Sequence, residues 1–132
     1  MKFELFHSRR KDAAVEGTRI EAGEIAIDLV RASEPLTVAV AGRMTVDSSP
    51  QLRSILLDLL RRGATPIVLV DLSALSSLDV SGIATLLEAL KAASERSIKL
   101  HLSGLSGQVR ALAEIIHLDA IFRSAGSEVD FR

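Results

Sequence analysis

The sequence predicts one α/β domain built on a mixed, mostly parallel β-sheet, with helices packed mainly on one face. Three observations support this class. The chain has 132 residues, of which 48% are hydrophobic and 25% charged, and this composition suits a single globular domain with its own core. Short runs typical of strands recur along the chain, and from residue 50 on they alternate with stretches of helical period. Strand–helix–strand units of this kind return to a parallel neighbour through a right-handed crossover.

The first part of the domain is predicted to hold a strand pair and a helix. Residues 24–31 alternate between apolar and polar positions, and residues 36–42 are rich in β-branched side chains, so both segments are typical of strands. A turn at 33–35 joins them into a hairpin. Asp47, two serines and a proline then precede a helix, which ends at Gly63.

The centre of the chain is predicted as strand, loop and helix. Residues 67–70 are an unbroken apolar run, short enough for a strand that is buried on both faces. The Ser-rich segment 73–80 is predicted as a loop, and from residue 82 the apolar residues fall on one helical face. The remaining predicted elements are a strand at 98–102 and a helix at 108–117.

The two ends of the chain are predicted to lie outside the domain. Residues 1–22 mix apolar and charged side chains without a sustained period, so we expect an N-terminal arm there. The domain then covers residues 23–124, and residues 125–132 form a C-terminal tail.

Composition excludes several classes of function. The net charge of −1 offers no overall basic field for nucleic acid, and no apolar run is long enough to cross a membrane. The chain has no cysteine, and its three histidines lack the spacing of metal ligands, so we expect no metal and no cofactor. No Gly-x-Ser-x-Gly motif is present and no base is marked for a nucleophile, so we predict no catalytic residue and a non-enzymatic protein. The N-terminus lacks the apolar core of a signal peptide, which favours a cytoplasmic location.

Ser81 stands at the predicted start of the central helix. The first N–H groups of a helix lack internal partners and the helix dipole is positive there, so a phosphate on this hydroxyl would be stabilised. Gly82, which follows, leaves the hydroxyl uncrowded. The plainer alternative is that the serine or the aspartate before it serves only as a helix cap.

Two segments of this region resemble the STAS domain family. Residues 71–73, Asp-Leu-Ser after an apolar strand, and residues 78–83, Leu-Asp-Val-Ser-Gly-Ile at the helix start, are similar to the motif of the bacterial anti-sigma factor antagonists in that family. The resemblance implies that Ser81 is the phosphorylated residue, because Val80 occupies the position where many antagonists have serine. It also implies that Asp47 lies beside the phosphorylatable serine; the alternative is that Asp47 is a helix N-cap. Residues 118–122 resemble the short closing strand of STAS domains. The predicted partner-binding residues are Asp47, Asp79, Val80, Ser81, Gly82 and Ile83.

The resemblance implies a regulator of transcription that acts by partner switching. The unmodified chain would bind an anti-sigma factor serine kinase with the fold of histidine-kinase-like ATPases, and phosphorylation of Ser81 would release it. A phosphatase is a further partner that this cycle admits. An alternative within the same family is a cytoplasmic subunit of a lipid-transport ABC complex, without a phosphorylation switch. A third is a scaffold or sensor subunit that makes its contact through the N-terminal arm.

Overall fold

The computed structural model of the chain describes residues 2–10, 13–31, 36–63 and 65–131. Within these ranges seven strands form one sheet, in the order β1-β2-β3-β4-β5-β6-β7. The strands are β1 (Lys2–Arg10), β2 (Ala13–Ala22), β3 (Ile25–Arg31), β4 (Leu36–Met44), β5 (Ile67–Leu78), β6 (Lys99–Ser103) and β7 (Glu128–Val129). The helices are α1 (Ser49–Arg62), α2 (Val80–Glu95), α3 (Gly107–Ile115) and α4 (Leu118–Ser124).

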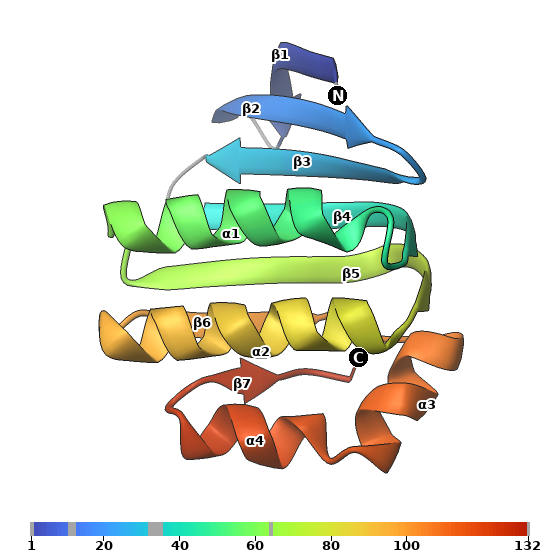
Figure 1. Ribbon diagram of the computed structural model, residues 1–132. Helices are drawn as coiled ribbons and strands as arrows, with labels where there is room; N and C mark the ends of the chain where they lie inside the picture. Colours follow the sequence, from blue (N-terminus) through green and yellow to red (C-terminus); the bar gives the residue numbers. More distant parts are fainter. Residues whose placement is uncertain (1, 11–12, 32–35, 64, 132) are drawn as a thin grey trace.

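The sheet has an antiparallel half and a parallel half. Strands β1 to β4 pair antiparallel, whereas β4 to β7 pair parallel. Helices α1 and α2 lie side by side on one face of the sheet, and α3 and α4 lie at its β7 end (Figure 1). The predicted mixed sheet with helices mainly on one face is therefore confirmed, with its parallel part after the first strands.

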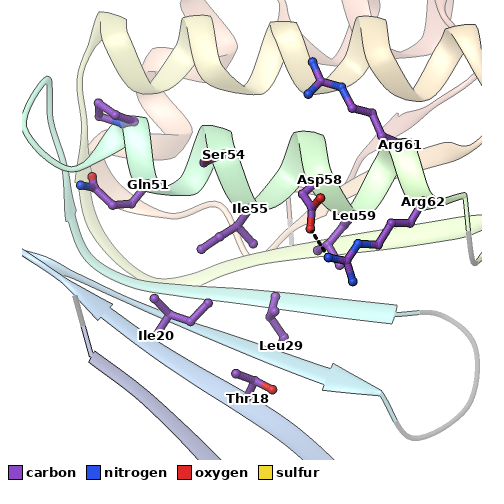
Figure 2. Close-up of a pocket in the computed structure, with 11 residues that line it drawn as sticks. Thr18, Ile20, Leu29, Gln51, Ser54, Ile55, Asp58, Leu59, Arg61 and Arg62 are labelled. Atoms are coloured by element: carbon purple, nitrogen blue, oxygen red, sulfur yellow. Dashed lines mark ion pairs between the residues drawn. The ribbon is translucent and has the colours of Figure 1, made fainter.

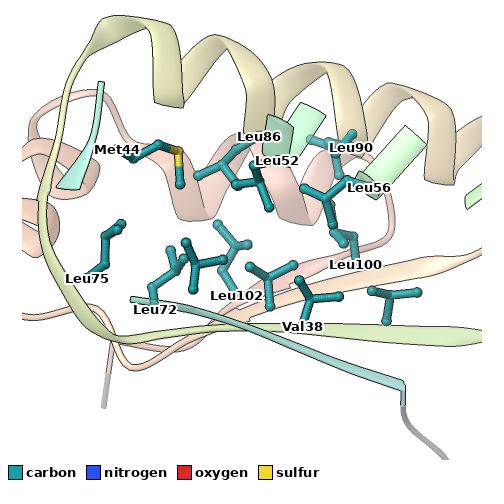
Figure 3. Packing of buried hydrophobic residues seen from close by; sticks show 14 of the residues in the cluster. Val38, Met44, Leu52, Leu56, Leu72, Leu75, Leu86, Leu90, Leu100 and Leu102 are labelled. Carbon is teal, nitrogen blue, oxygen red and sulfur yellow. The ribbon is translucent and has the colours of Figure 1, made fainter. Parts of the chain in front are cut away.

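The core lies between this sheet face and the two long helices. Val38, Val70 and Leu102 are paired across β4, β5 and β6 and are fully buried. Leu56 of α1 and Leu86 of α2 close over the same layer (Figure 3). Burial of each such side chain stabilises the fold by about 2 kcal/mol, so these rows fix both helices on the sheet.

The predicted loop at 73–80 is wrong, because β5 continues to Leu78. Its buried residues Leu72, Leu75 and Leu78 are three apart instead of two. Register shifts between β4 and β5 account for this spacing, since each shift offsets the alternation by one residue. The long strand carries the chain directly to the start of α2.

The predicted closing strand at 118–122 is also wrong, because these residues form helix α4. Leu118 and Phe122 are buried four residues apart, and Asp119 and Arg123 form an ion pair at the same spacing. The closing strand lies later in the chain, in β7, where Asp130 N also donates to Leu102 O (2.7 Å). Part of the predicted tail therefore belongs to the sheet.

The predicted arm, residues 1–22, contributes two strands within its described part. Strand β2 pairs with β3, and β1 pairs with β2, so the sheet extends beyond the predicted first hairpin. The predicted turn at 33–35 lies outside the described residues.

Candidate functional site

Helix α2 begins at Val80, and its N-cap is Asp79. The backbone of Asp79 is extended, and its Oδ1 accepts a hydrogen bond from Gly82 N (3.1 Å). Ser81 is therefore the second residue of the helix and not its cap. An aspartate in this position is a strong helix-starting residue, because its carboxylate pairs one of the free N–H groups and complements the helix dipole.

The Asp79 carboxylate joins three parts of the site. Ser81 Oγ donates a hydrogen bond to Asp79 Oδ1, beside the bond from Gly82 N. Val46 N, in the segment between β4 and α1, donates to Asp79 Oδ2 (3.1 Å). The bond from the Ser81 side chain, helped by the backbone N–H groups of Gly82, Val46 and Ser81, holds the pKa of Asp79 below its ordinary value, although desolvation opposes the shift. At neutral pH the carboxylate is thus ionised, and both of its oxygens accept hydrogen bonds from the domain.

The strand end below this carboxylate is fixed by α3 and β4. Gln108 of α3 forms two hydrogen bonds with the backbone of Leu78, accepting from its N–H (2.9 Å) and donating to its carbonyl (3.0 Å). Asp79 N donates to Met44 O at the end of β4 (3.2 Å). These hydrogen bonds tie the end of β5, from which α2 and Ser81 start, to α3 and β4.

Two valines and Ser81 form the outer surface of the site. Val80 is 79% exposed and Val46 67% exposed, so both present apolar surface to solvent. Ser81 follows Val80 in sequence, and the Asp79 carboxylate links the Ser81 hydroxyl to the backbone of Val46. Val46 was not predicted as a site residue, because the hydrogen bond that places it crosses 33 positions of the chain.

Two of the predicted site residues, Gly82 and Ile83, are turned into the domain and are buried. A Cβ at Gly82 would overlap the Leu78 side chain and lie 2.8 Å from Met44 Sδ. The absence of a side chain at Gly82 therefore allows α2 to pack closely on the Leu78 and Met44 side chains at the strand ends.

Asp47 lies in the same β4–α1 segment as Val46 and is exposed. It is not a helix cap, because Ser48 is the N-cap residue of α1. Ser48 instead holds the segment together, since its buried hydroxyl accepts from Thr45 N and donates to Arg43 O (both 2.9 Å). Along the described residues, the Asp47 carboxylate makes no hydrogen bond or ion pair, so it can face a partner.

The Ser81 hydroxyl lies where it can take part in binding or be modified. Asp79 is a weak base because its pKa is lowered, so it is a poor activator of the Ser81 hydroxyl. Across the part of the chain that the structure describes, no three His, Cys, Asp or Glu residues are grouped to hold a metal ion. No helix in the same ranges is long and apolar enough to cross a membrane.

Residues 27–123 match the family model described as "Mlab, STAS domain". The chain belongs to the STAS domain family. Two solved structures with this fold are anti-sigma factor antagonists. SpoIIAA in its unphosphorylated form is 20% identical, with a TM-score of 0.61, over 76% of this chain and 96% of SpoIIAA. An antagonist from Mycobacterium paratuberculosis is 14% identical, with a TM-score of 0.59, over 92% of this chain and 83% of that protein. At these identities the likeness establishes the fold of this STAS domain.

Proposed function

We propose that this STAS domain is an anti-sigma factor antagonist that works by partner switching at Ser81. The observation that carries the proposal is the exposed apolar surface of Val46 and Val80 beside a serine at the start of α2. An exposed apolar pair with a polar surround is typical of a protein-binding surface. The similarity in fold to two anti-sigma factor antagonists supports an anti-sigma factor as the partner. The protein is a non-enzymatic, cytoplasmic regulator of transcription in this proposal.

The unmodified surface would bind an anti-sigma factor kinase of the histidine-kinase-like ATPase fold. Phosphorylation would add between one and two negative charges at Ser81, next to the ionised Asp79 and on the same surface as Asp47. The Ser81–Asp79 hydrogen bond would be lost and replaced by repulsion, since the hydroxyl proton is no longer there to donate. The modified surface would therefore be polar and acidic where the contact is apolar, and the kinase would be released. A phosphatase would return the domain to its binding form.

The proposal is tested by the affinity of Ser81 variants for the kinase. Ser81→Asp should bind the kinase at least about tenfold more weakly than the unmodified chain, because a buried unpaired charge costs more than 1.4 kcal/mol. Ser81→Ala should bind as the unmodified chain does but resist phosphorylation. Calorimetric titration with the purified kinase measures both values, and equal affinity of the two variants would exclude the switch.

A second candidate function is a cytoplasmic subunit of a lipid-transport ABC complex. Two observations favour it: the matching family model carries the name Mlab, and the Ser81 hydroxyl is already engaged by Asp79. The same apolar surface would then clamp an ATPase permanently, with Ser81 as part of the support. Co-purification with an ATPase and a permease, with Ser81 unmodified, would favour this candidate over the kinase.

A further inference from the structure

A groove runs along the flank of α1 that faces away from α2. Its floor is formed by Ile20 of β2 and Leu29 of β3, and its wall by Ile55 and Leu59 of α1 (Figure 2). The groove has a volume of about 700 Å³ and extends from the first turn of α1 to Arg62 in the last. Its central part is apolar, and its ends are polar.

The groove is a vacant position in the helix layer of the sheet. Helix α2 lies along one side of α1, where Arg53 and Glu88 form an ion pair across the two helices (2.6 Å). On the other side of α1, no helix of the described residues covers β2 and β3 (Figure 1). Leu29, Ile55 and Leu59 remain partly exposed there, although they pack on the edge of the core. Helices on a sheet pack 8–10 Å apart, about the width of one side-chain layer, so a third helix beside α1 would complete the layer.

The dimensions of the groove suit a helix of about three turns. The twelve residue steps from Pro50 to Arg62 correspond to about 18 Å along α1. An amphipathic helix of this length presents apolar side chains at positions i, i+3 or i+4, and i+7, which is the pattern that grooves between secondary-structure elements recognise.

Charged side chains at one end of the groove indicate which charge the bound helix carries there. Asp58 and Arg62 form an ion pair there (2.9 Å), and their side chains are 61% and 71% exposed. An exposed pair of this kind stabilises the domain by less than about 1 kcal/mol, so Arg62 can exchange Asp58 for a carboxylate of another molecule. Arg61 lies at the same end and has no ion pair in the described part of the chain. Arg61 adds a positive charge to this end of α1, with its side chain directed toward α2, and Arg62 is the arginine on the side of the groove floor (Figure 2).

We propose that this groove binds an amphipathic helix of a partner protein, with an acidic residue at the end that meets Arg62. The site is distinct from the Ser81 surface, because none of its lining residues belongs to that surface, which lies at the start of α2. It is also a feature of this chain beyond the matched STAS residues 27–123, since Thr18 and Ile20 of its floor precede them. The domain would then hold two partners, or two parts of one partner, at the same time.

The test uses the full chain and two synthetic 18-residue peptides. Both peptides carry leucine at positions i, i+3, i+4 and i+7, which form the apolar face. On the opposite face, one peptide has glutamate and the other has lysine. Methyl NMR follows the resonances of Ile20, Leu29, Ile55 and Leu59 during titration. We expect the glutamate peptide to shift these methyls and the lysine peptide to bind more weakly.

Matched variants separate the groove from the rest of the helix. Ser54→Trp fills the groove from an exposed position, so it should weaken binding of the glutamate peptide about tenfold or more without disturbing the core. Arg53→Trp places the same side chain on the α2 flank and should change binding by less than about twofold. Arg62→Glu should weaken binding of the glutamate peptide more than binding of the lysine peptide.

Three outcomes would overturn the proposal. The first is that the resonances of the groove methyls do not shift at millimolar glutamate peptide. The second is that Ser54→Trp and Arg53→Trp weaken peptide binding equally. The third is that the groove resonances shift with protein concentration alone, which would assign the groove to a second copy of the chain. Because the kinase takes no part in this experiment, its result is independent of the switch at Ser81.

Discussion

Replacement of Asp79 by alanine should destabilise the domain through one carboxylate. The change removes the N-cap of α2, the bond from Ser81 Oγ and the tie to Val46 N. Loss of an N-cap aspartate costs about 1 kcal/mol. The other two hydrogen bonds are only partly shielded from water, so each contributes about 0.5 kcal/mol, at the low end of the usual range. The free energy of unfolding should therefore fall by about 2 kcal/mol.

Urea unfolding at pH 7, followed by circular dichroism, measures this loss. The midpoint should fall while the slope of the transition stays constant, because the surface exposed on unfolding is unchanged. For a chain of 132 residues the same loss lowers Tm by about 8 °C. Asp79→Asn should lose only about 1 kcal/mol, since asparagine is an equally good N-cap but carries no charge.

Asp47→Ala is the matched control for this prediction. Asp47 is also an acidic residue near the start of a helix and is exposed, so its removal should change the free energy of unfolding by less than about 0.5 kcal/mol. If Asp79→Ala were no more destabilising than Asp47→Ala, the role of Asp79 as the residue that joins α2 to the β4–α1 segment would be refuted.

Three further predictions follow from the same region. Because the folded pKa of Asp79 lies below its unfolded value, the contribution of its charge to stability is present above about pH 4 and is lost as the pH falls through the folded pKa. In urea unfolding, the difference in stability between the parent chain and Asp79→Asn should therefore shrink on acidification. A difference that stays constant with pH would contradict the lowered pKa. Gly82→Ala should lower the free energy of unfolding by about 1–3 kcal/mol, measured by thermal unfolding, because the added methyl overlaps Leu78 and crowds Met44. An unchanged free energy of unfolding would show that the Leu78 and Met44 side chains can move aside. Gln108→Ala should cost about 1–2 kcal/mol by leaving the Leu78 backbone unpaired, and hydrogen exchange of the Leu78 amide should become faster; unchanged exchange would exclude this support.

Local sequence signals predicted the start of α2 and the residues around it. The apolar period after residue 82 and the Asp79–Gly82 spacing are short-range features, and both describe the observed helix closely. The position of Ser81 at the helix start follows from the same signals. The mixed sheet was also predictable, because strands with a clear alternation, such as β4, alternate with helical stretches.

The remaining features depend on contacts between distant parts of the chain. Strand β5 was predicted too short because its Ser-rich second half owes its extended form to pairing with β4, which no local pattern reveals. Helix α4 was predicted as a strand from its resemblance to the closing strand of STAS domains, whereas burial of Leu118 and Phe122 four residues apart stabilises a helix. Val46 and Gln108 reach the site across 33 and 30 positions of the sequence.

Phosphorylation of Ser81 in the bound and unbound forms of the chain is the most direct test of partner switching. The chain is purified from its native cell, separated into free and complexed pools, and the peptide that contains Ser81 is analysed by mass spectrometry in each pool. The switch predicts an unmodified Ser81 in complexes with a histidine-kinase-like ATPase and a phosphorylated Ser81 in the free pool. An unmodified Ser81 in both pools, with transporter subunits in the complexes, would contradict it and assign Ser81 to a permanent interface.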